Sequence, residues 1–334
     1  MKGRFYSTID YNDMPQLACG LQARILEVDD EGLLQTVRRV LKILSAVPTA
    51  SVILLESGSG RFHPDLIAAA LIGFLPRRYR PYMIVMGAMW QKDKGIRGLI
   101  DTLVLKFADR AIQRYAVQSH EELTVFPEIW NIAPSKVRYC HYFYTLTDRE
   151  LEDTAHPDGA YIFAGGNAHR DYEPLLEAAY RLPDQKFIIA TRLRFPDVPP
   201  NVVLQSVPHE QFVKFMKEAR VVITPIKPNL TRAAGQQTYL NAMRLGKVTV
   251  VNNKSVFGVR EYIKDGENGV TVDGTAEGYI AALEWLLNPA NRATVEAMQA
   301  SARQSVESTF TYENHVACLT RIIDELLESE ASAD

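Results

Sequence analysis

Short apolar runs alternate with longer amphipathic stretches along the first part of the chain. The runs have the length of buried strands, and the stretches between them show the spacing of helices. The predicted strands are residues 23–28, 51–56, 82–87, 111–118 and 137–142, and the predicted helices are 32–46, 65–75, 96–109 and 121–130. This order predicts an α/β domain with a doubly wound parallel sheet.

The alternation stops and then begins again. Residues 145–159 are polar and end in Pro157, Asp158 and Gly159, as is typical of a linker. The later strands are predicted at 160–164, 186–190, 202–204, 221–224, 248–251 and 270–272, and the later helices at 171–182, 209–219, from 235 onwards, 276–287, 292–308 and 312–327. We therefore predict two Rossmann-like domains, residues 1–150 and 151–311, that face each other across a cleft.

The stretch that begins near residue 231 contains a candidate phosphate-binding site. Gly235, Gln236, Gln237 and Thr238 are small or polar residues at the point where a helical pattern starts. A helix start presents free backbone N–H groups and the positive end of the helix dipole, and both favour a bound phosphate. Gly246 ends this helix before a strand of four apolar or β-branched residues, which predicts a position inside a parallel sheet.

Two neighbouring motifs resemble a known family. Residues 241–251 are Asn-Ala-Met-Arg-Leu-Gly-Lys-Val-Thr-Val-Val, and residues 258–269 are Gly-Val-Arg-Glu-Tyr-Ile-Lys-Asp-Gly-Glu-Asn-Gly. Both resemble the nucleotide-sugar half of family-4-like glycosyltransferases with the GT-B fold. That family usually has a pair of glutamates before these motifs, whereas this chain has Ala233 and Asn241 there.

The resemblance implies an activity and its partners. It implies a hexosyltransferase-like enzyme that moves a sugar from a nucleoside diphosphate sugar to an acceptor hydroxyl in glycan or glycoconjugate synthesis. The acceptor would be a sugar, a lipid-linked molecule or a small molecule. Family-4-like enzymes usually retain the anomeric configuration and need no metal.

The resemblance also implies the position of the last helix. Residues 312–334, a helix with an acidic tail, would cross back to the first domain, and the apolar stripe of this helix needs a surface to cover. The stripe comprises Val316, Leu319, Ile322, Ile323, Leu326 and Leu327.

Several side chains are candidates for the donor site. Gly165, Gly166 and Asn167 follow the first strand of the second domain, and Arg170 follows them at the predicted helix start. The glycines would let the backbone approach a ligand, and Arg170 would reach its pyrophosphate. The alternative is a tight turn in which Arg170 pairs with a surface carboxylate. We expect Arg170, Lys227 and the helix start at Gly235 to stabilise the departing diphosphate.

Other candidates concern the remaining parts of the substrates. The resemblance places Arg192 and Val207 near the nucleobase, although Arg192 would equally suit a solvated face. Asn241 can hydrogen-bond ribose hydroxyls as donor and acceptor. Gly58 lies on the acceptor side, facing the donor phosphates, as a catalytic candidate, although a glycine-rich loop after a strand is common. His169, next to Arg170, is the histidine expected nearest the donor.

Composition excludes some classes of protein. The chain of 334 residues has 37 basic and 40 acidic side chains, a net charge of −3, so it has no overall attraction for nucleic acid. Three widely spaced cysteines, without metal-ligand spacing among the histidines, argue against a disulfide framework or a metal site and favour a cytoplasmic protein. No apolar run reaches the length of about 18 residues that a membrane span needs.

The segment 66–80 has two interpretations. Its apolar residues followed by Pro-Arg-Arg-Tyr-Arg would suit a peripheral contact at the inner face of a membrane. We favour the other interpretation, in which Leu66, Ile67, Ala70 and Leu71 simply cover the sheet, although periodicity does not separate the two.

Two other functions stay open. The missing glutamate pair fits a weakened or inactive GT-B protein that binds nucleotide and regulates. A nicotinamide-dependent oxidoreductase would need G-x-G-x-x-G after its first strand, but Gly58-Ser-Gly60 lacks the third glycine and follows the second predicted strand.

Overall fold

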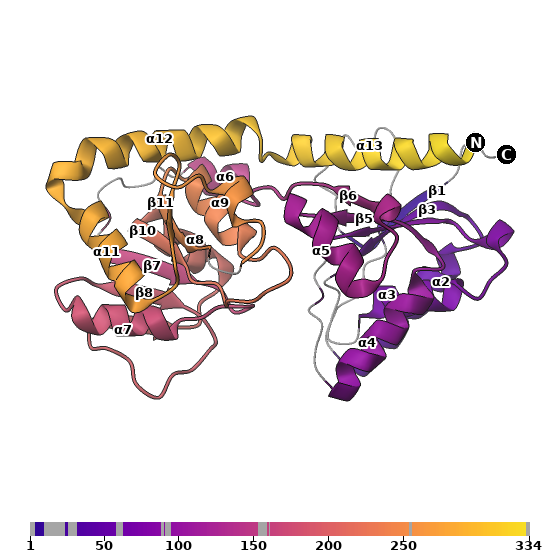
Figure 1. The fold of residues 1–334 in the computed structure, drawn as a ribbon, viewed down its shortest axis with the longest axis horizontal. Coiled ribbons are helices and arrows are strands. Elements are labelled where there is room, and N and C mark those ends of the chain that lie inside the picture. The colour runs from indigo at the N-terminus through magenta and orange to yellow at the C-terminus, as the bar shows by residue number, and fades with distance from the viewer. Residues whose placement is uncertain are drawn as a thin grey trace. The chain divides into compact units, whose positions relative to one another are not determined.

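The computed structural model describes residues 4–9, 24–25, 32–57, 63–87, 90, 95–152, 159, 161–253 and 256–331 (Figure 1). The chain forms two compact units, one of residues 1–141 and 313–334 and the other of residues 142–312. Within the described residues, no helix is both long and apolar enough to cross a lipid bilayer.

The first unit contains a parallel sheet in the order β2-β1-β3-β4-β5-β6. Its strands are β1 (Arg4–Ser7), β2 (Arg24–Ile25), β3 (Ala50–Glu56), β4 (Tyr82–Met86), β5 (Ile112–Val117) and β6 (Val137–Tyr139). Strand β1 was not predicted, because four residues are too few to show a strand period. Yet three of the four are buried, and β1 pairs with both β2 and β3.

The helices of this unit are α2 (Leu33–Ala46), α3 (Pro64–Ile72), α4 (Gly95–Ala108) and α5 (His120–Trp130), with 3-10 turns η1 (Arg77–Tyr79) and η2 (Pro134–Lys136). The connections that contain α2, α3 and α4 all advance in the same direction across the sheet. Right-handed crossovers therefore place these helices on one face. They form one layer there, with α3 in contact with both neighbours (Figure 1).

The last helix, α13 (Tyr312–Ala331), packs on the opposite face of the first unit (Figure 1). Arg138 after η2 forms an ion pair with Glu325 at 3.0 Å, and the Cys318 thiol donates to the carbonyl of Tyr139 at 3.4 Å. The apolar stripe predicted from the sequence lies against this unit, and five of its six residues are buried: Val316, Leu319, Ile322, Ile323 and Leu326.

His315 on α13 provides a pH-dependent contribution to stability. It is buried, its Nδ1 lies 2.6 Å from the carbonyl oxygen of His141, and burial lowers its pKa to about 4. The unfolded chain binds the proton below about pH 6.5, whereas the folded chain resists it down to about pH 4. The contribution of this histidine to the free energy of unfolding is therefore fully present above about pH 6.5, and it is lost as the pH falls from about 6.5 to about 4.

We expect this histidine to account for about 3 kcal/mol of the loss between pH 6.5 and pH 4. Urea unfolding across that range, compared with His315→Gln, measures it. The glutamine variant should show a shallower pH dependence, and His120→Gln, which replaces an exposed ring on α5, should keep the wild-type slope. An equal slope in all three proteins would contradict the assignment.

The second unit contains a parallel sheet in the order β12-β11-β10-β7-β8-β9. Its strands are β7 (Tyr161–Gly165), β8 (Phe187–Ala190), β9 (Val202–Gln205), β10 (Ala219–Thr224), β11 (Val248–Asn252) and β12 (Val270–Val272). Its helices are α6 (Asp148–Glu152), α7 (Glu173–Arg181), α8 (His209–Lys217), α9 (Gln236–Arg244), α10 (Val259–Tyr262), α11 (Ala276–Leu287) and α12 (Arg292–Ser308), with the turn η3 (Pro289–Asn291). This is the Rossmann order, and its direction reverses between β7 and β10.

The boundary between the units falls at His141–Tyr142, earlier than the predicted boundary at residue 150. The reason lies in backbone hydrogen bonds. Tyr142 donates its N–H to the Tyr262 hydroxyl at 3.0 Å, and Tyr144 donates to the carbonyl of Phe310 at 3.2 Å. These residues therefore belong to the second unit, although the sequence predicted residue 142 as the end of a strand of the first domain.

Candidate functional site

The carboxyl ends of β7 and β10 form the topological switch point of the second sheet, where ligands bind in open α/β folds. The chain leaves β7 through Gly165 and Gly166. Gly166 has φ 112°, and a Cβ there would lie 2.9 Å from Nη2 of Arg170. Glycine is therefore required for Arg170 to lie across this backbone.

Arg170 is a buried cation at the switch point, held by several hydrogen bonds. It is 7% exposed, and it donates to the carbonyls of Gly165 at 3.1 Å and Ala168 at 3.0 Å and to the Thr238 hydroxyl at 3.0 Å. All three acceptors are uncharged, and no carboxylate of the described residues pairs with it. The surface-carboxylate alternative is therefore wrong within the described chain. Burial lowers the pKa of this guanidinium, and a buried cation without a counter-ion favours an anionic ligand.

Three cations surround His169 in the same loop. Burial first, and then the charges of Arg232, Arg170 and Lys227, lower the pKa of His169 to about 4. The carbonyl of His169 accepts the N–H of Lys227 at 2.9 Å, which joins the loops after β7 and β10. The Lys227 side chain is exposed and makes no hydrogen bond or ion pair with the residues that the structure describes. The switch point is therefore strongly electropositive.

Arg232 is a further cation of this site that was not predicted from the sequence. It lies three residues before Gly235 and is 5% exposed, with its Nη1 donating to the carbonyl of Ala233 at 3.2 Å. Its place just before the helix start was visible in the sequence. Its proximity to His169 depends on the pairing of β7 with β10, which sequence spacing does not show.

Helix α9 begins at this positive region. Gly235 has φ 82°, and a Cβ there would lie 2.9 Å from side-chain atoms of Thr224 and Ile226. The helix start therefore requires glycine. Gln236 and Thr238 are buried in the first turn, and Gln237 is exposed. Thr238 connects the turn to Arg170, so the predicted loop and the predicted helix start are brought together.

Asn241 has a partner that the sequence did not suggest. Its Oδ1 accepts the N–H of Thr145 at 2.8 Å, and its Nδ2 donates to the Thr145 hydroxyl at 3.1 Å. Gln237 donates to the same hydroxyl at 3.0 Å. Ala233 is buried and forms a β-bridge with Phe257. In this structure Asn241 holds the segment that enters the second unit, and its ribose contact stays a prediction.

We expect Asn241→Ala to lower the free energy of unfolding of the second unit by about 1–2 kcal/mol, because both bonds to Thr145 are lost. Chemical denaturation measures this effect. Thr145→Val is the matched control, since it removes only the hydroxyl. Nucleotide affinity, measured by calorimetry, tests whether Asn241 also contacts the ribose. Weaker binding in Asn241→Ala but not in Thr145→Val would show such a contact. Unchanged stability of Asn241→Ala would contradict the structural role.

The remaining donor candidates line the adjacent loops. The Asn167 Oδ1 accepts the N–H of Arg192 at 2.7 Å and the Thr191 hydroxyl at 3.0 Å, so Asn167 joins the loops after β7 and β8. The side chain of Arg192 is exposed. Val207 is half-buried and packs against the apolar cluster beside α8. Their contact with a nucleobase stays a prediction.

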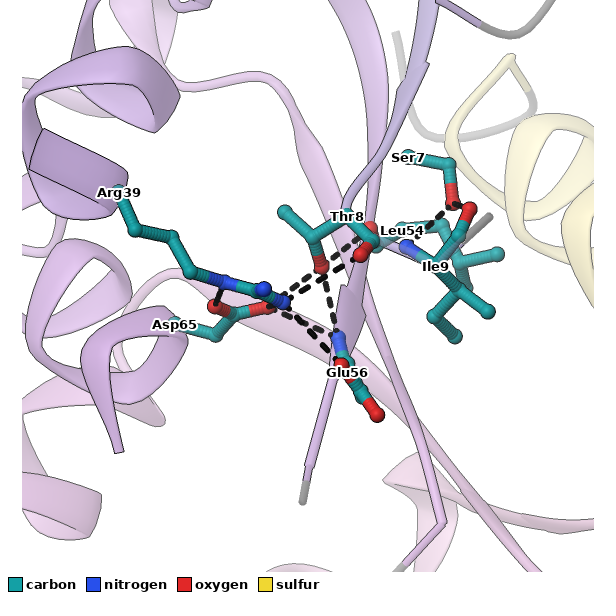
Figure 2. A network of polar contacts seen from close by, with 7 residues as sticks. All are labelled: Ser7, Thr8, Ile9, Arg39, Leu54, Glu56 and Asp65. Atoms are coloured by element: carbon teal, nitrogen blue, oxygen red, sulfur yellow. Dashed lines mark hydrogen bonds and ion pairs between the residues drawn. The ribbon is translucent and has the colours of Figure 1, made fainter. Parts of the chain in front are cut away.

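Gly58 lies outside the described residues. The described residues just before and after it form a buried polar network at the ends of β1 and β3 (Figure 2). Asp65 on α3 accepts from Nε of Arg39 on α2 at 2.6 Å and from the N–H of Glu56 at 2.9 Å. Nη2 of Arg39 also pairs with Glu56 at 3.2 Å, and the Thr8 hydroxyl donates to Asp65 at 2.5 Å. The order β2-β1-β3 makes this the switch point of the first sheet.

The described residues of the two switch points form no metal cage. Among the residues that the structure describes, no three His, Cys, Asp or Glu side chains gather as metal ligands. The positive charge at the second switch point comes from the arginines and the lysine of the chain itself.

The second unit matches a known family model. The model described as glycosyl transferases group 1 matches residues 166–289, which include the loop of Arg170 and the start of α9. No curated protein is similar to the sequence. The resemblance stated from the two motifs is therefore confirmed on this part of the chain.

Solved structures share the fold over nearly the whole chain. A glycosyltransferase from Rickettsia africae is 11% identical with a TM-score of 0.63, covering 96% of this chain and 89% of that chain. HepE from Anabaena with UDP-glucose is 13% identical with a TM-score of 0.66, covering 97% and 91%. Sucrose-phosphate synthase from Thermosynechococcus elongatus is 14% identical with a TM-score of 0.63, covering 92% and 84%.

These comparisons define the class of protein. The chain has the GT-B fold of glycosyltransferases, with two Rossmann-like units, as predicted. Together with the group 1 match, the fold supports a transferase of sugars.

Proposed function

We propose that the protein transfers a sugar from a nucleoside diphosphate sugar to an acceptor hydroxyl, and that the donor diphosphate binds at the switch point of the second sheet. The observation that carries this proposal is the buried guanidinium of Arg170, whose three acceptors are all uncharged. A diphosphate supplies the missing negative charge, and the exposed ammonium of Lys227 lies on the adjacent loop.

The same groups would act on the transition state. Cleavage of the bond between sugar and diphosphate leaves negative charge on the departing phosphate, so cations held in place beforehand stabilise it. Arg170 is held by bonds to two carbonyls and one hydroxyl and needs little rearrangement. The start of α9 adds the positive end of its dipole. The resemblance to family-4-like enzymes implies retention of configuration and no metal requirement.

Uridine nucleotides are the first donors to test. HepE, which shares the fold, was solved with UDP and with UDP-glucose. We therefore propose a uridine diphosphate hexose as donor, with a sugar, lipid-linked or small-molecule acceptor.

Thermal unfolding with UDP, GDP, ADP, CDP and TDP and their sugars tests the donor class. A nucleotide at 100 times its Kd should stabilise the protein by about 2.7 kcal/mol. A bound diphosphate should also raise the pKa of His169 from about 4, because it offsets the three cations that lower it. Magnetic resonance titration of His169 measures that shift. If no nucleotide stabilises the protein or moves this pKa, the proposal is wrong.

One observation favours a second function. Ala233 and Asn241 replace the usual glutamates, and Asn241 is bonded to Thr145. A protein that binds nucleotide without turnover would suit this site. Binding of a nucleotide sugar without release of diphosphate, across an acceptor panel, would favour this alternative over transfer.

A further inference from the structure

Exposed large apolar side chains gather on the helical layer of the first unit. Within the described residues, all but three of the large exposed hydrophobic side chains lie on α2, on α4, or between the end of α3 and η1. The three others, Tyr180, Val203 and Trp285, are scattered over the second unit. Single exposed apolar residues are ordinary, but a concentration on adjacent elements marks an interaction surface.

On α2, the exposed apolar residues are Leu33, Leu34, Val37 and Leu41, which are 47–68% exposed. At 100° per residue they occupy an arc of about 100° beside the arc that is buried against the unit. Arg38 and Lys42 lie next to the apolar arc, on the side away from the buried arc. Long cationic side chains at the edge of an apolar stripe suit a helix that lies at a polar–apolar boundary.

Helix α4 shows the same feature more strongly. Ile96, Leu99, Ile100 and Leu103 are 79%, 61%, 53% and 44% exposed. They occupy an arc of about 100° on the side of the helix opposite to the buried Leu105. This helix is therefore apolar on two sides, and among the residues that the structure describes, its own unit covers only one of them.

The end of α3 joins these two helices. Leu66 is buried, as the sheet-covering interpretation predicted, but Leu71 and Phe74 are 47% and 65% exposed. Tyr79 in η1 is 58% exposed. The interpretation favoured from the sequence therefore holds for Leu66 and is wrong for Leu71, which is exposed although the next residue, Ile72, is buried.

Basic residues surround this surface. The exposed or half-buried cations of α2, α4 and the chain around η1 are Arg38, Lys42, Arg77, Arg78, Arg80, Lys106 and Arg110. The described acidic side chains of these segments are Asp65, which is buried in its network, Asp101 and Asp109, which pairs with Lys136. The described basic side chains of these segments therefore outnumber the acidic ones, whereas the whole chain has a net charge of −3.

We infer that the apolar and basic layer of α2, α3 and α4 binds the surface of an anionic lipid bilayer. The apolar arcs would enter the boundary between headgroups and acyl chains, and the cations would contact the headgroup phosphates. A second copy of the chain fits less well. A two-fold interface brings the same patch of each copy together, which would set these like charges against one another. The inference does not depend on the proposed sugar transfer.

Sedimentation with vesicles tests the inference on the full chain. We expect binding to vesicles of phosphatidylglycerol and phosphatidylcholine, little binding to phosphatidylcholine alone, and weaker binding at high salt. The double variant Ile96→Gln with Leu99→Gln should weaken binding roughly tenfold or more, because two inserted side chains are lost. Arg38→Gln with Arg78→Gln should weaken binding to anionic vesicles and reduce its salt dependence.

Matched variants of the second unit provide the controls. Trp285→Gln removes an exposed apolar side chain there, and Lys214→Gln with Arg260→Gln removes two exposed cations. These variants should bind vesicles as the wild type does. Equal losses in test and control variants, or no binding of wild type to anionic vesicles, would overturn the inference. So would a wild-type dimer in light scattering that Ile96→Gln with Leu99→Gln converts to a monomer, since the surface would then bind a second copy.

Discussion

Asp65→Ala is expected to lower the free energy of unfolding of the first unit by about 3–5 kcal/mol. Asp65 is 1% exposed and Arg39 is 4% exposed, so the substitution leaves a buried guanidinium without its main partner. It also removes the acceptor of the Glu56 N–H and of the Thr8 hydroxyl. Glu56 still pairs with Arg39, which places the loss toward the lower end of this range.

Urea unfolding followed by tryptophan fluorescence measures this loss, since Trp90 and Trp130 both lie in the core of the first unit. Asp101→Ala, at a half-buried position on α4, is the control and should change stability little. Arg39→Met combined with Asp65→Leu should recover part of the loss, because both buried charges are removed. A stability of Asp65→Ala within about 0.5 kcal/mol of wild type would show that the ion pair is not important for stability.

Arg170→Ala is expected to weaken binding of a nucleoside diphosphate by about 1.5–3 kcal/mol, because a charge-assisted contact to phosphate is lost. Arg170→Gln is the sharper variant. It keeps a side-chain donor for the loop carbonyls but removes the charge, so it should lose nearly as much affinity as alanine. Calorimetric titration with UDP gives both values.

Two further variants separate charge from loop structure. Lys227→Ala removes an exposed cation and should weaken binding while leaving the thermal stability of the free protein unchanged. Thr238→Val removes one acceptor of Arg170 and keeps every charge, so it should bind UDP nearly as well as wild type. Full affinity in Arg170→Gln, with the fold intact, would exclude Arg170 from the diphosphate site.

Much of the fold could be predicted from local pattern. Buried strands of a parallel sheet are short apolar runs, and the helices between them repeat every three to four residues, so both are visible without tertiary information. The positions of the two glycine turns that we propose for phosphate binding follow as well, since Gly166 and Gly235 lie where backbone geometry requires glycine. Strand β1 was not predicted because its four residues are too few to show a period. The unit boundary at Tyr142 was not predicted because it depends on a hydrogen bond to Tyr262, which composition does not show.

The sequence by itself determined the alternation of strands and helices and the two Rossmann-like units, and it supplied the residues that we propose for the diphosphate site. Only the tertiary structure decided the partners of these residues. Arg170 reaches Thr238 across 68 positions of sequence, and Asn241 bonds to Thr145 across 96. Arg39 and Asp65 meet because α2 and α3 pack together, and α4 keeps an apolar side that no other described residue of its unit covers. The physical reason is that periodicity reports which side of an element is apolar, whereas sheet order and helix packing determine what lies against it.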